Sequence, residues 1–232
     1  MEGDRLHVGI QVTNRGSAAA HQVTVEAEAL EERFESRIQT RIDPSGSRKF
    51  DFSKSFPSSL RGSFPLTVLV RFQDSAGYPF SALTCTTFVI RERGDAGLAT
   101  ASDPLTIKDK GEVQFQILNE SSSSRRIEAK LVLPNEFSSE KPETHISLPA
   151  GGKETLSFQI RNISAIHGAK YPVFLIQQYE LNGVTRTIVP NVLVTVASNQ
   201  NWLRKTKWHW AGGFLVAAAF FIFSKTGANI RK

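Results

Sequence analysis

The sequence predicts an all-β protein in which two tandem antiparallel β-sandwiches are followed by a single C-terminal transmembrane helix. Short runs of alternating apolar residues, separated by turn residues, predict the strands. An internal repeat of about one domain's length predicts two copies of the same fold. An uncharged apolar run framed by cations near the C-terminus predicts the membrane span.

The repeat is visible when the first strand-like segment is placed over its counterpart. "VGIQVTN" (8–14) and "VQFQILN" (113–119) both end in Asn, and the two Asn residues are 105 positions apart. Three more landmarks recur at nearly the same spacing: Pro44 with Pro149, Phe64-Pro65 with Tyr171-Pro172, and "TFVI" (87–90) with "LVTV" (193–196). The chain is therefore a tandem repeat, with domains expected at residues 1–95 and 96–198.

Each repeat is expected to form one antiparallel β-sandwich of about seven short strands. Neither repeat has a sustained helical period. Alternation is clear in Val23-Val25-Ala27-Ala29 and in Ile127-Ala129-Leu131-Leu133, and clusters of Pro, Gly, Ser and Asn interrupt these runs. The apolar content of 40% is sufficient for a core in each repeat.

The first repeat lacks the segment that precedes the first aligned strand of the second. In the second repeat, residues 97–111 contain an expected strand at Leu105 to Ile107, whose counterpart would fall at or before residue 2. Either an edge strand has been lost, or the natural polypeptide begins upstream of Met1. We expect the second, because proteins normally cover an exposed sheet edge.

The C-terminal region divides into a basic juxtamembrane linker (199–207), a transmembrane helix (208–224) and a basic tail (225–232). The uncharged run from Trp208 to Phe223 has 16 residues, giving roughly 24 Å of helix against a hydrocarbon core of about 30 Å. The expected anchor residues are Trp208, Trp210, Phe214, Leu215, Phe220, Phe221 and Phe223. Expected headgroup contacts are Arg204, Lys205, Lys207 and Lys225.

Charge distribution favours lipid over nucleic acid as a partner of the basic residues. The two repeats each contain equal numbers of basic and acidic residues, so the whole net charge of +6 belongs to residues 199–232. The folded domains therefore have no excess of cations to neutralise phosphates, and no nucleic-acid partner is expected. The cations are expected to contact membrane lipid.

The turn motifs resemble those of a known group of sandwich modules. "NRG" followed by "SAAAHQVTVEAE", and again "LNESSSSRRIEAKLVL", are similar to CARDB-type and related bacterial Ig-like modules, in which an Asn-led turn and a small or polar run join two strands. The resemblance covers residues 2–197 in two copies and implies non-catalytic binding or spacer modules at a cell surface or in a periplasm. The single Cys85 departs from antibody domains, which have a Cys…Trp…Cys framework.

No catalytic residue, cofactor site or metal site is expected. The five His residues have no metal-ligand spacing, and the sequence has no phosphate loop and no Gly-x-Ser-x-Gly motif. Cys85 is expected to be a buried thiol in a strand rather than a nucleophile. The carboxylates Glu31, Glu32 and Glu35 are expected on the surface, in a charged strand end or a short helical turn.

These observations favour a membrane-anchored, non-catalytic interaction or scaffold subunit of a cell-envelope assembly. It would bind a protein partner through sandwich loops or an open sheet edge. One alternative is a carbohydrate-binding accessory module of an envelope enzyme, using Tyr78 or Tyr179. Another is a cytosolic tail-anchored adaptor. We expect a single-pass protein with extracytoplasmic sandwiches, periplasmic or at the cell surface, although the three cations on each side of the span do not set the topology.

Overall fold

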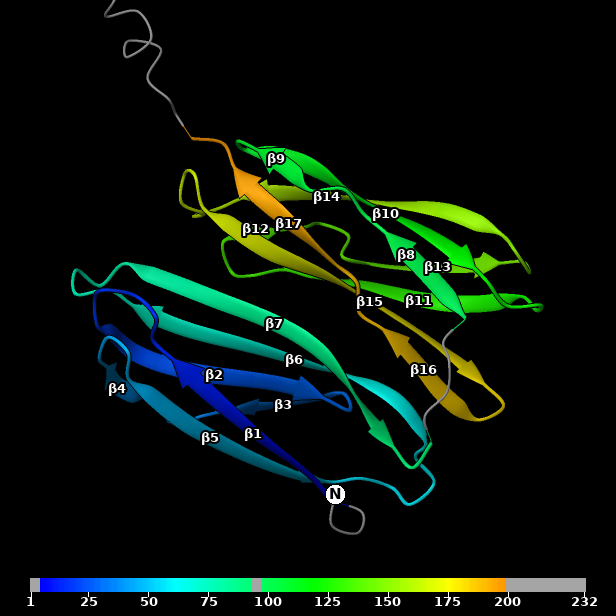
Figure 1. Ribbon diagram of the computed structural model, residues 1–232, viewed down its shortest axis with the longest axis horizontal. Coiled ribbons are helices and arrows are strands. Elements are labelled where there is room, and N and C mark those ends of the chain that lie inside the picture. Colours follow the sequence, from blue (N-terminus) through cyan, green and yellow to red (C-terminus); the bar gives the residue numbers. More distant parts are fainter. Residues whose placement is uncertain (1–4, 93–96, 199–232) are drawn as a thin grey trace, which may run out of the picture. The chain divides into compact units, whose positions relative to one another are not determined.

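The structure is a computed structural model, and it describes residues 5–92 and 97–198. Every regular element in these ranges is a β-strand (Figure 1). Within these ranges, no helix long and apolar enough to cross a membrane is found. The predicted transmembrane helix at 208–224 and its flanking basic residues lie outside the described residues.

The first sandwich contains strands β1 to β7, and the second contains β8 to β17. The first set is β1 (Arg5–Thr13), β2 (Ala20–Ala29), β3 (Glu32–Glu35), β4 (Gln39–Ile42), β5 (Ser47–Ser55), β6 (Gly62–Gln73) and β7 (Pro79–Ile90). The second set is β8 (Leu98–Ala101), β9 (Leu105–Ile107), β10 (Lys110–Asn119), β11 (Arg125–Val132), β12 (Phe137–Ser138), β13 (Glu143–Leu148), β14 (Lys153–Asn162), β15 (Lys170–Leu181), β16 (Val184–Ile188) and β17 (Asn191–Val196).

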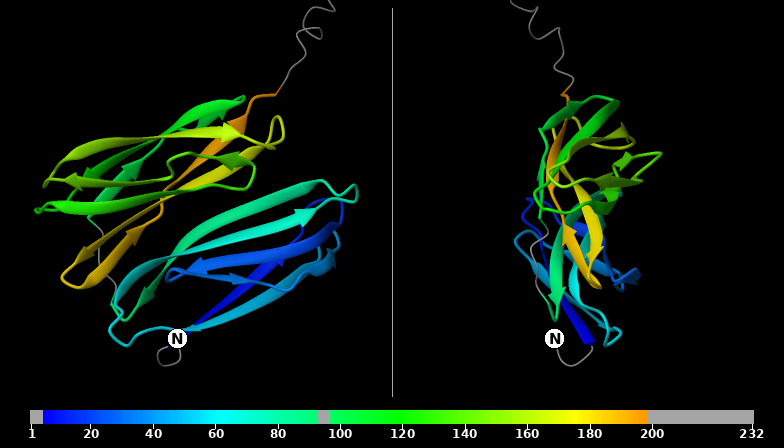
Figure 2. Two further views of the ribbon diagram at one scale, coloured as in Figure 1. Left: turned by 180° about the vertical axis from the view of Figure 1, so that it is seen from behind. Right: turned by 90° about the vertical axis from the view of Figure 1, so that its right-hand side faces the viewer.

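In the first sandwich, a sheet of β1 and β5 packs over a sheet in which β2 and β7 flank β6 (Figure 2). Strands β3 and β4 both pair with β2. The apolar residues that alternate along β2 all point to its buried side. Their exposed fractions are at most 2%: Val23, Val25, Ala27 and Ala29. Ala29 packs with Phe64 of β6 in one small apolar cluster, and Val25 and Ala27 pack with Val68 of β6 in another.

In the second sandwich, one sheet has the order β12-β14-β10-β8, and β13-β11-β15 with β16, β17 and β9 forms the other. The core is one continuous apolar cluster between them. Strand β10 shows the two-residue period most clearly, because Val113, Phe115 and Ile117 are buried while Gln114 and Gln116 are exposed. The all-β sandwich architecture predicted from the sequence is thus confirmed for both repeats.

The segment before β10 contains two strands, where the sequence analysis expected one. The expected strand at Leu105–Ile107 is β9, which pairs in parallel with β17. The unexpected strand is β8, which pairs antiparallel with β10 in the opposite sheet. The chain changes sheets around Pro104, a residue without a backbone N–H to offer either ladder. One segment therefore covers an edge of both sheets.

The two sandwiches belong to one compact unit, Met1–Ala197. Strand β16 meets β6 in a short parallel pairing of Thr185 with Gly62. Gly62 has a φ of 122°, and a Cβ there would lie 2.0 Å from the carbonyl oxygen of Thr185. The backbones can approach this closely only because residue 62 has no side chain.

Candidate functional site

The strongest candidate for an interaction site is the side of β1 that faces away from β5, called here the open edge. In the second sandwich, the equivalent strand β10 pairs with β14 on one side and with β8 on the other. Among the described residues, β1 pairs with β5 alone. A strand with one free side presents unpaired backbone N–H and C=O groups to any chain that can align with it.

The groups on the open edge can be identified from the end of the strand. The backbone N–H of Asn14 donates to the carbonyl oxygen of Gly46 at 2.9 Å, on the side of β5. Since successive N–H groups of a strand point to opposite sides, those of Gly9, Gln11 and Thr13 point to the open edge. All three residues are exposed.

Burial along β1 differs from that along β10 in a way that matches the missing neighbour. The three apolar residues of β10 that face the core, Val113, Phe115 and Ile117, are at most 1% exposed. Their counterparts in β1 are only half-buried: Val8, Ile10 and Val12. Apolar side chains beside the open edge thus remain partly in contact with water.

The inner face of β7 is uncovered as well. Ala82, Thr84 and Thr86 share the face of β7 that carries the buried Ile90, yet all three are exposed. In the second sandwich the corresponding face of β17 is buried, with Val194 at 0% exposure. Among the described residues, no strand covers the first sandwich along the side between β1 and β7.

One end of this open side is closed by a side chain. Leu6 in β1 is 5% exposed and packs with Phe64 and Ile90. Its counterpart in β10 is Gly111, where a Cβ would lie 2.2 Å from Cγ2 of Ile107. Ile107 of β9 can therefore pack there only because residue 111 is a glycine. The first sandwich has Leu6 at the position equivalent to Gly111. Leu6 fills the space that β9 uses in the second sandwich.

A second group of functional interest joins the two sandwiches beside β7. The carboxylate of Glu136, 4% exposed, accepts the backbone N–H of Ser81 at 2.7 Å and the Ser81 hydroxyl at 2.5 Å. The N–H of Asn135 donates to the Ser81 hydroxyl oxygen at 3.1 Å. The Tyr78 hydroxyl donates to the carbonyl oxygen of Ser164 at 3.2 Å. These bonds cover part of the outer edge of β7.

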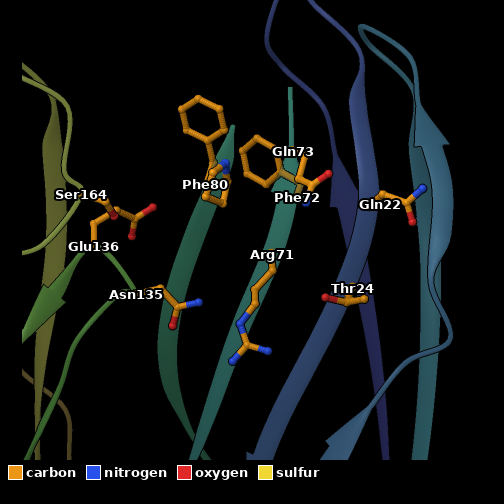
Figure 3. A pocket seen from close by; sticks show the side chains of 10 residues that line it. Gln22, Thr24, Arg71, Phe72, Gln73, Phe80, Asn135, Glu136 and Ser164 are labelled. Atoms are coloured by element: carbon orange, nitrogen blue, oxygen red, sulfur yellow. The ribbon is translucent and has the colours of Figure 1, made fainter. Parts of the chain in front are cut away.

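A cavity of about 380 Å³ lies beside this contact. Figure 3 shows Asn135, Glu136 and Ser164 on one side and residues of β2, β6 and β7 on the other. Its cation, Arg71, forms an ion pair with Glu26, whose side chain is 7% exposed and also pairs with Arg33. Because the charge of Arg71 is already compensated, the cavity suits an uncharged ligand better than an anion.

Cys85 lies in an apolar cluster with Leu83 of β7 and Phe174 and Ile176 of β15. Burial raises the pKa of its thiol, and a hydrogen bond of 3.3 Å with the Thr67 hydroxyl opposes this shift only in part. The thiol therefore stays protonated at neutral pH, where a nucleophilic Cys would need to ionise. The predicted burial of Cys85 is confirmed.

The structure also locates other residues discussed in the sequence analysis. Tyr78 is 45% exposed, whereas Tyr179 is 6% exposed and lies in the core. Glu31 and Glu32 belong to a tight hairpin between β2 and β3, with positive φ at Leu30 and Glu31, rather than to a helical turn. In residues 5–92 and 97–198, His, Cys, Asp and Glu form no group of three that could hold a metal ion.

The predicted anchor residues lie outside the described residues: Trp208, Trp210, Phe214, Leu215, Phe220, Phe221 and Phe223. The sequence analysis expected an open edge but did not single out Gln11, Leu6, Ser81 or Glu136. Leu6 had a detectable signal, since the repeat aligns it with a glycine. Glu136 had none, because its role depends on contact with a strand 55 residues away.

Comparisons with known proteins give structural likeness alone. Neither any family model nor any curated protein matches the chain. Among solved structures, 83% of this chain is similar to 15% of a Salmonella alpha-2-macroglobulin variant, at 10% identity and a TM-score of 0.38. A red sea bream transglutaminase matches 83% of this chain over 29% of its own, at 14% identity and a TM-score of 0.30. Native alpha-2-macroglobulin of E. coli matches 71% of this chain over 10% of its own, at 12% identity and a TM-score of 0.37. The chain thus spans less than a third of each.

Proposed function

We propose that this protein is a membrane-anchored, non-catalytic interaction subunit of a cell-envelope assembly, and that it binds a protein partner at the open edge of its first sandwich. The observation that carries the proposal is the difference between two equivalent strands. Strand β10 is paired on both sides, whereas β1 is paired with β5 alone among the described residues. A free strand edge is a common site for addition of a partner's backbone.

The join between the sandwiches supports a role as one binding unit. Glu136 is nearly buried and is bonded to Ser81 through both carboxylate oxygens. Hydrogen bonds to a charged group are stronger than neutral ones. A partner held by the first sandwich is therefore held at a defined position relative to the second.

The sequence supports the membrane anchor and the compartment. Uncharged residues from Trp208 to Phe223 lie between two groups of cations, as in a single-pass span. The resemblance to CARDB-type modules favours extracytoplasmic sandwiches over a cytosolic tail-anchored adaptor.

Photo-crosslinking from two equivalent turns tests the proposed function. Arg15 follows β1 beside the open edge, and its counterpart Glu120 follows β10 beside the edge that β8 covers. Both residues are exposed. A photoreactive amino acid at position 15 should give an adduct that maps to a discrete segment of one protein, and the same group at position 120 should not. Equal labelling from both positions would contradict the proposal.

Binding of an uncharged glycan is a second candidate function, favoured by one observation. The exposed ring of Tyr78 packs edge-on against Phe80, with 5.2 Å between ring centroids, next to the cavity that Gln22, Gln73 and Asn135 line with amides. Aromatic rings beside amide groups suit sugar hydroxyls and C–H faces. A glycan array probed with the 232-residue chain should give signals that Tyr78→Ala removes; signals that survive this change would exclude the site.

A further inference from the structure

We infer that the partner supplies one extended strand, which pairs antiparallel with β1 opposite Gln11–Asn14 and stops before Leu6. The inference rests on the proposed function and specifies what occupies the open edge. The same chain shows what such an occupant looks like, because β8 covers the equivalent edge of β10 in the second sandwich.

The register follows from the repeat. In the second sandwich, Gln116 lies opposite Ala101 and Asn119 lies opposite Leu98. The counterparts of Gln116 and Asn119 in the first sandwich are Gln11 and Asn14, since the two strands are offset by 105 residues. The partner strand therefore bonds to the N–H groups of Gln11 and Thr13, which point to the open edge.

The side chains behind the edge define the chemistry of the partner strand. In β8, Leu98 enters the core, and the Thr100 hydroxyl donates to the side-chain oxygen of the fully buried Gln177 at 3.0 Å. The residue that corresponds to Gln177 is Val70, which offers no acceptor. The inward residue at the position of Thr100 must then be apolar, because a hydroxyl there would be buried without a partner.

Leu6 limits the length of the strand. The segment after β8 continues as β9 and places Ile107 over Gly111. Leu6 already fills this space in the first sandwich, so a partner cannot continue along β7 as β9 continues along β17. The site accepts a short strand of alternating small and apolar residues, and it excludes a longer segment that closes both sheets.

A tethered strand tests this geometry in the 232-residue chain, purified in mild detergent. A copy of residues 97–103 is joined ahead of Met1 by a flexible linker of about eight Gly and Ser residues, which raises its effective concentration to about the millimolar range. Amide exchange at Gln11 and Thr13 should slow by about tenfold or more. A Thr100→Val change within the tethered copy should slow it further, because Val70 lies behind that position.

Two proline variants are matched controls. Gln11→Pro removes an N–H on the open edge and should cancel the added protection at Thr13. Lys49 lies opposite Gln11 in β5, so its own N–H points away from β1. Lys49→Pro should therefore leave the added protection in place. Protection that survives Gln11→Pro would place the tethered strand elsewhere.

The remaining outcomes each decide the inference. Unchanged exchange with both the Thr and the Val copies overturns it. A dimer in sedimentation whose open-edge amides are already protected without a tether assigns the edge to a second copy and overturns it too. If position 15 crosslinks a partner whose attached segment leaves these amides unprotected, the inference fails and the proposed function stands. If the tethered strand binds but position 15 captures no partner, the geometry stands and the proposed function fails.

Discussion

Asn14 and Asn119 share three side-chain hydrogen bonds at equivalent turns of the two sandwiches. The side-chain amide of Asn14 donates to the carbonyl oxygens of Ala18 at 2.8 Å and Ile42 at 3.0 Å. That of Asn119 donates to the equivalent carbonyls of Ser123 at 2.9 Å and Leu148 at 3.1 Å. Each side-chain oxygen accepts the backbone N–H of the residue two positions later in the chain: Gly16 for Asn14 and Ser121 for Asn119. Asparagine thus joins three backbone segments at each turn, which explains why it is the residue that ends both aligned segments.

Replacing these asparagines should destabilise the protein unequally. Asn119 is fully buried and also donates to the carbonyl oxygen of Pro149 at 2.8 Å, whereas Asn14 is half-buried. Asn119→Ala should lower the free energy of unfolding by about 2 kcal/mol and Asn14→Ala by about 1 kcal/mol, because unpaired groups cost more when water cannot reach them. Denaturant unfolding measures both changes. An equal loss would contradict the role of burial.

Substitutions at the equivalent positions Leu6 and Gly111 should disturb the two sandwiches in different ways. Leu6→Ala leaves a cavity beside Phe64 and should lower the free energy of unfolding by about 2 to 4 kcal/mol. Gly111→Leu places a side chain in the space of Ile107 and should displace β9. Amide exchange in β9 and β17 should then become faster, while β10 and β14 keep their protection.

Gly9→Leu is the control for the second substitution. Gly9 is an exposed glycine in a strand, and a Cβ there would meet only a side-chain oxygen of Asp51 at 3.3 Å. Its effect on stability should be below about 1 kcal/mol. If Gly9→Leu lowered stability as much as Gly111→Leu, the loss would come from replacing any glycine in a strand and not from the overlap with Ile107.

Strand positions could be predicted from this sequence because the signal was local. Alternation in segments such as Val23-Val25-Ala27-Ala29 decided which face of β2 is buried, and the repeat supplied a second example of every landmark. Local patterns also identified β9 through Leu105 and Ile107. The short strand β8 was missed, because "LATA" is a small, weakly apolar run whose pairing with β10 is a tertiary contact.

Long-range contacts between side chains were beyond prediction for the same reason. Sequence analysis predicted that the first repeat lacks a covering strand but did not identify the residue that fills part of its space. That Leu6 replaces Ile107 depends on how two strands from different sheets meet. The partnership of Ser81 and Glu136 has no local pattern, since neither residue differs in sequence context from a solvated surface group.

Loss of the Ser81 hydroxyl should loosen the contact between the sandwiches. Ser81→Ala removes the hydroxyl that donates to Glu136 and accepts from Asn135, but it retains the backbone N–H bond. The free energy of unfolding should fall by about 1 to 3 kcal/mol, and amide exchange should become faster at Ser81 but not at Leu175 in the core of β15. Ser75→Ala, in an exposed turn, is the control. Unchanged exchange at Ser81 would mean that the hydrogen bonds of the Ser81 hydroxyl contribute nothing to the contact between the sandwiches.

Cys85 should make stability fall with rising pH in the alkaline range. Burial raises the pKa of the folded thiol above its ordinary value of 9.0. Above about pH 9 the unfolded thiol loses its proton while the folded thiol retains it, so the unfolded state binds fewer protons and the free energy of unfolding decreases. Cys85→Ala should cost about 1 kcal/mol at neutral pH and should remove this part of the decrease. Parallel pH profiles for the two proteins would contradict the raised pKa.

Truncation after Ser198 should release the protein from the membrane without unfolding it. Among the described residues, Val196 is the last buried position of the sandwich cores, and its N–H donates to the carbonyl oxygen of Ala169 at 3.0 Å. The truncated chain lacks the uncharged run from Trp208 to Phe223 and the cations around it, which the proposed function assigns to lipid contact. It should therefore appear in the supernatant after carbonate washing, with the same denaturant midpoint as the 232-residue chain in detergent. A truncated chain that stays in the membrane fraction would show that the sandwiches themselves, or a membrane-bound partner, hold it there. Adding Gln11→Pro to the truncated chain separates these two cases. Only a partner bound at the open edge depends on the N–H of Gln11.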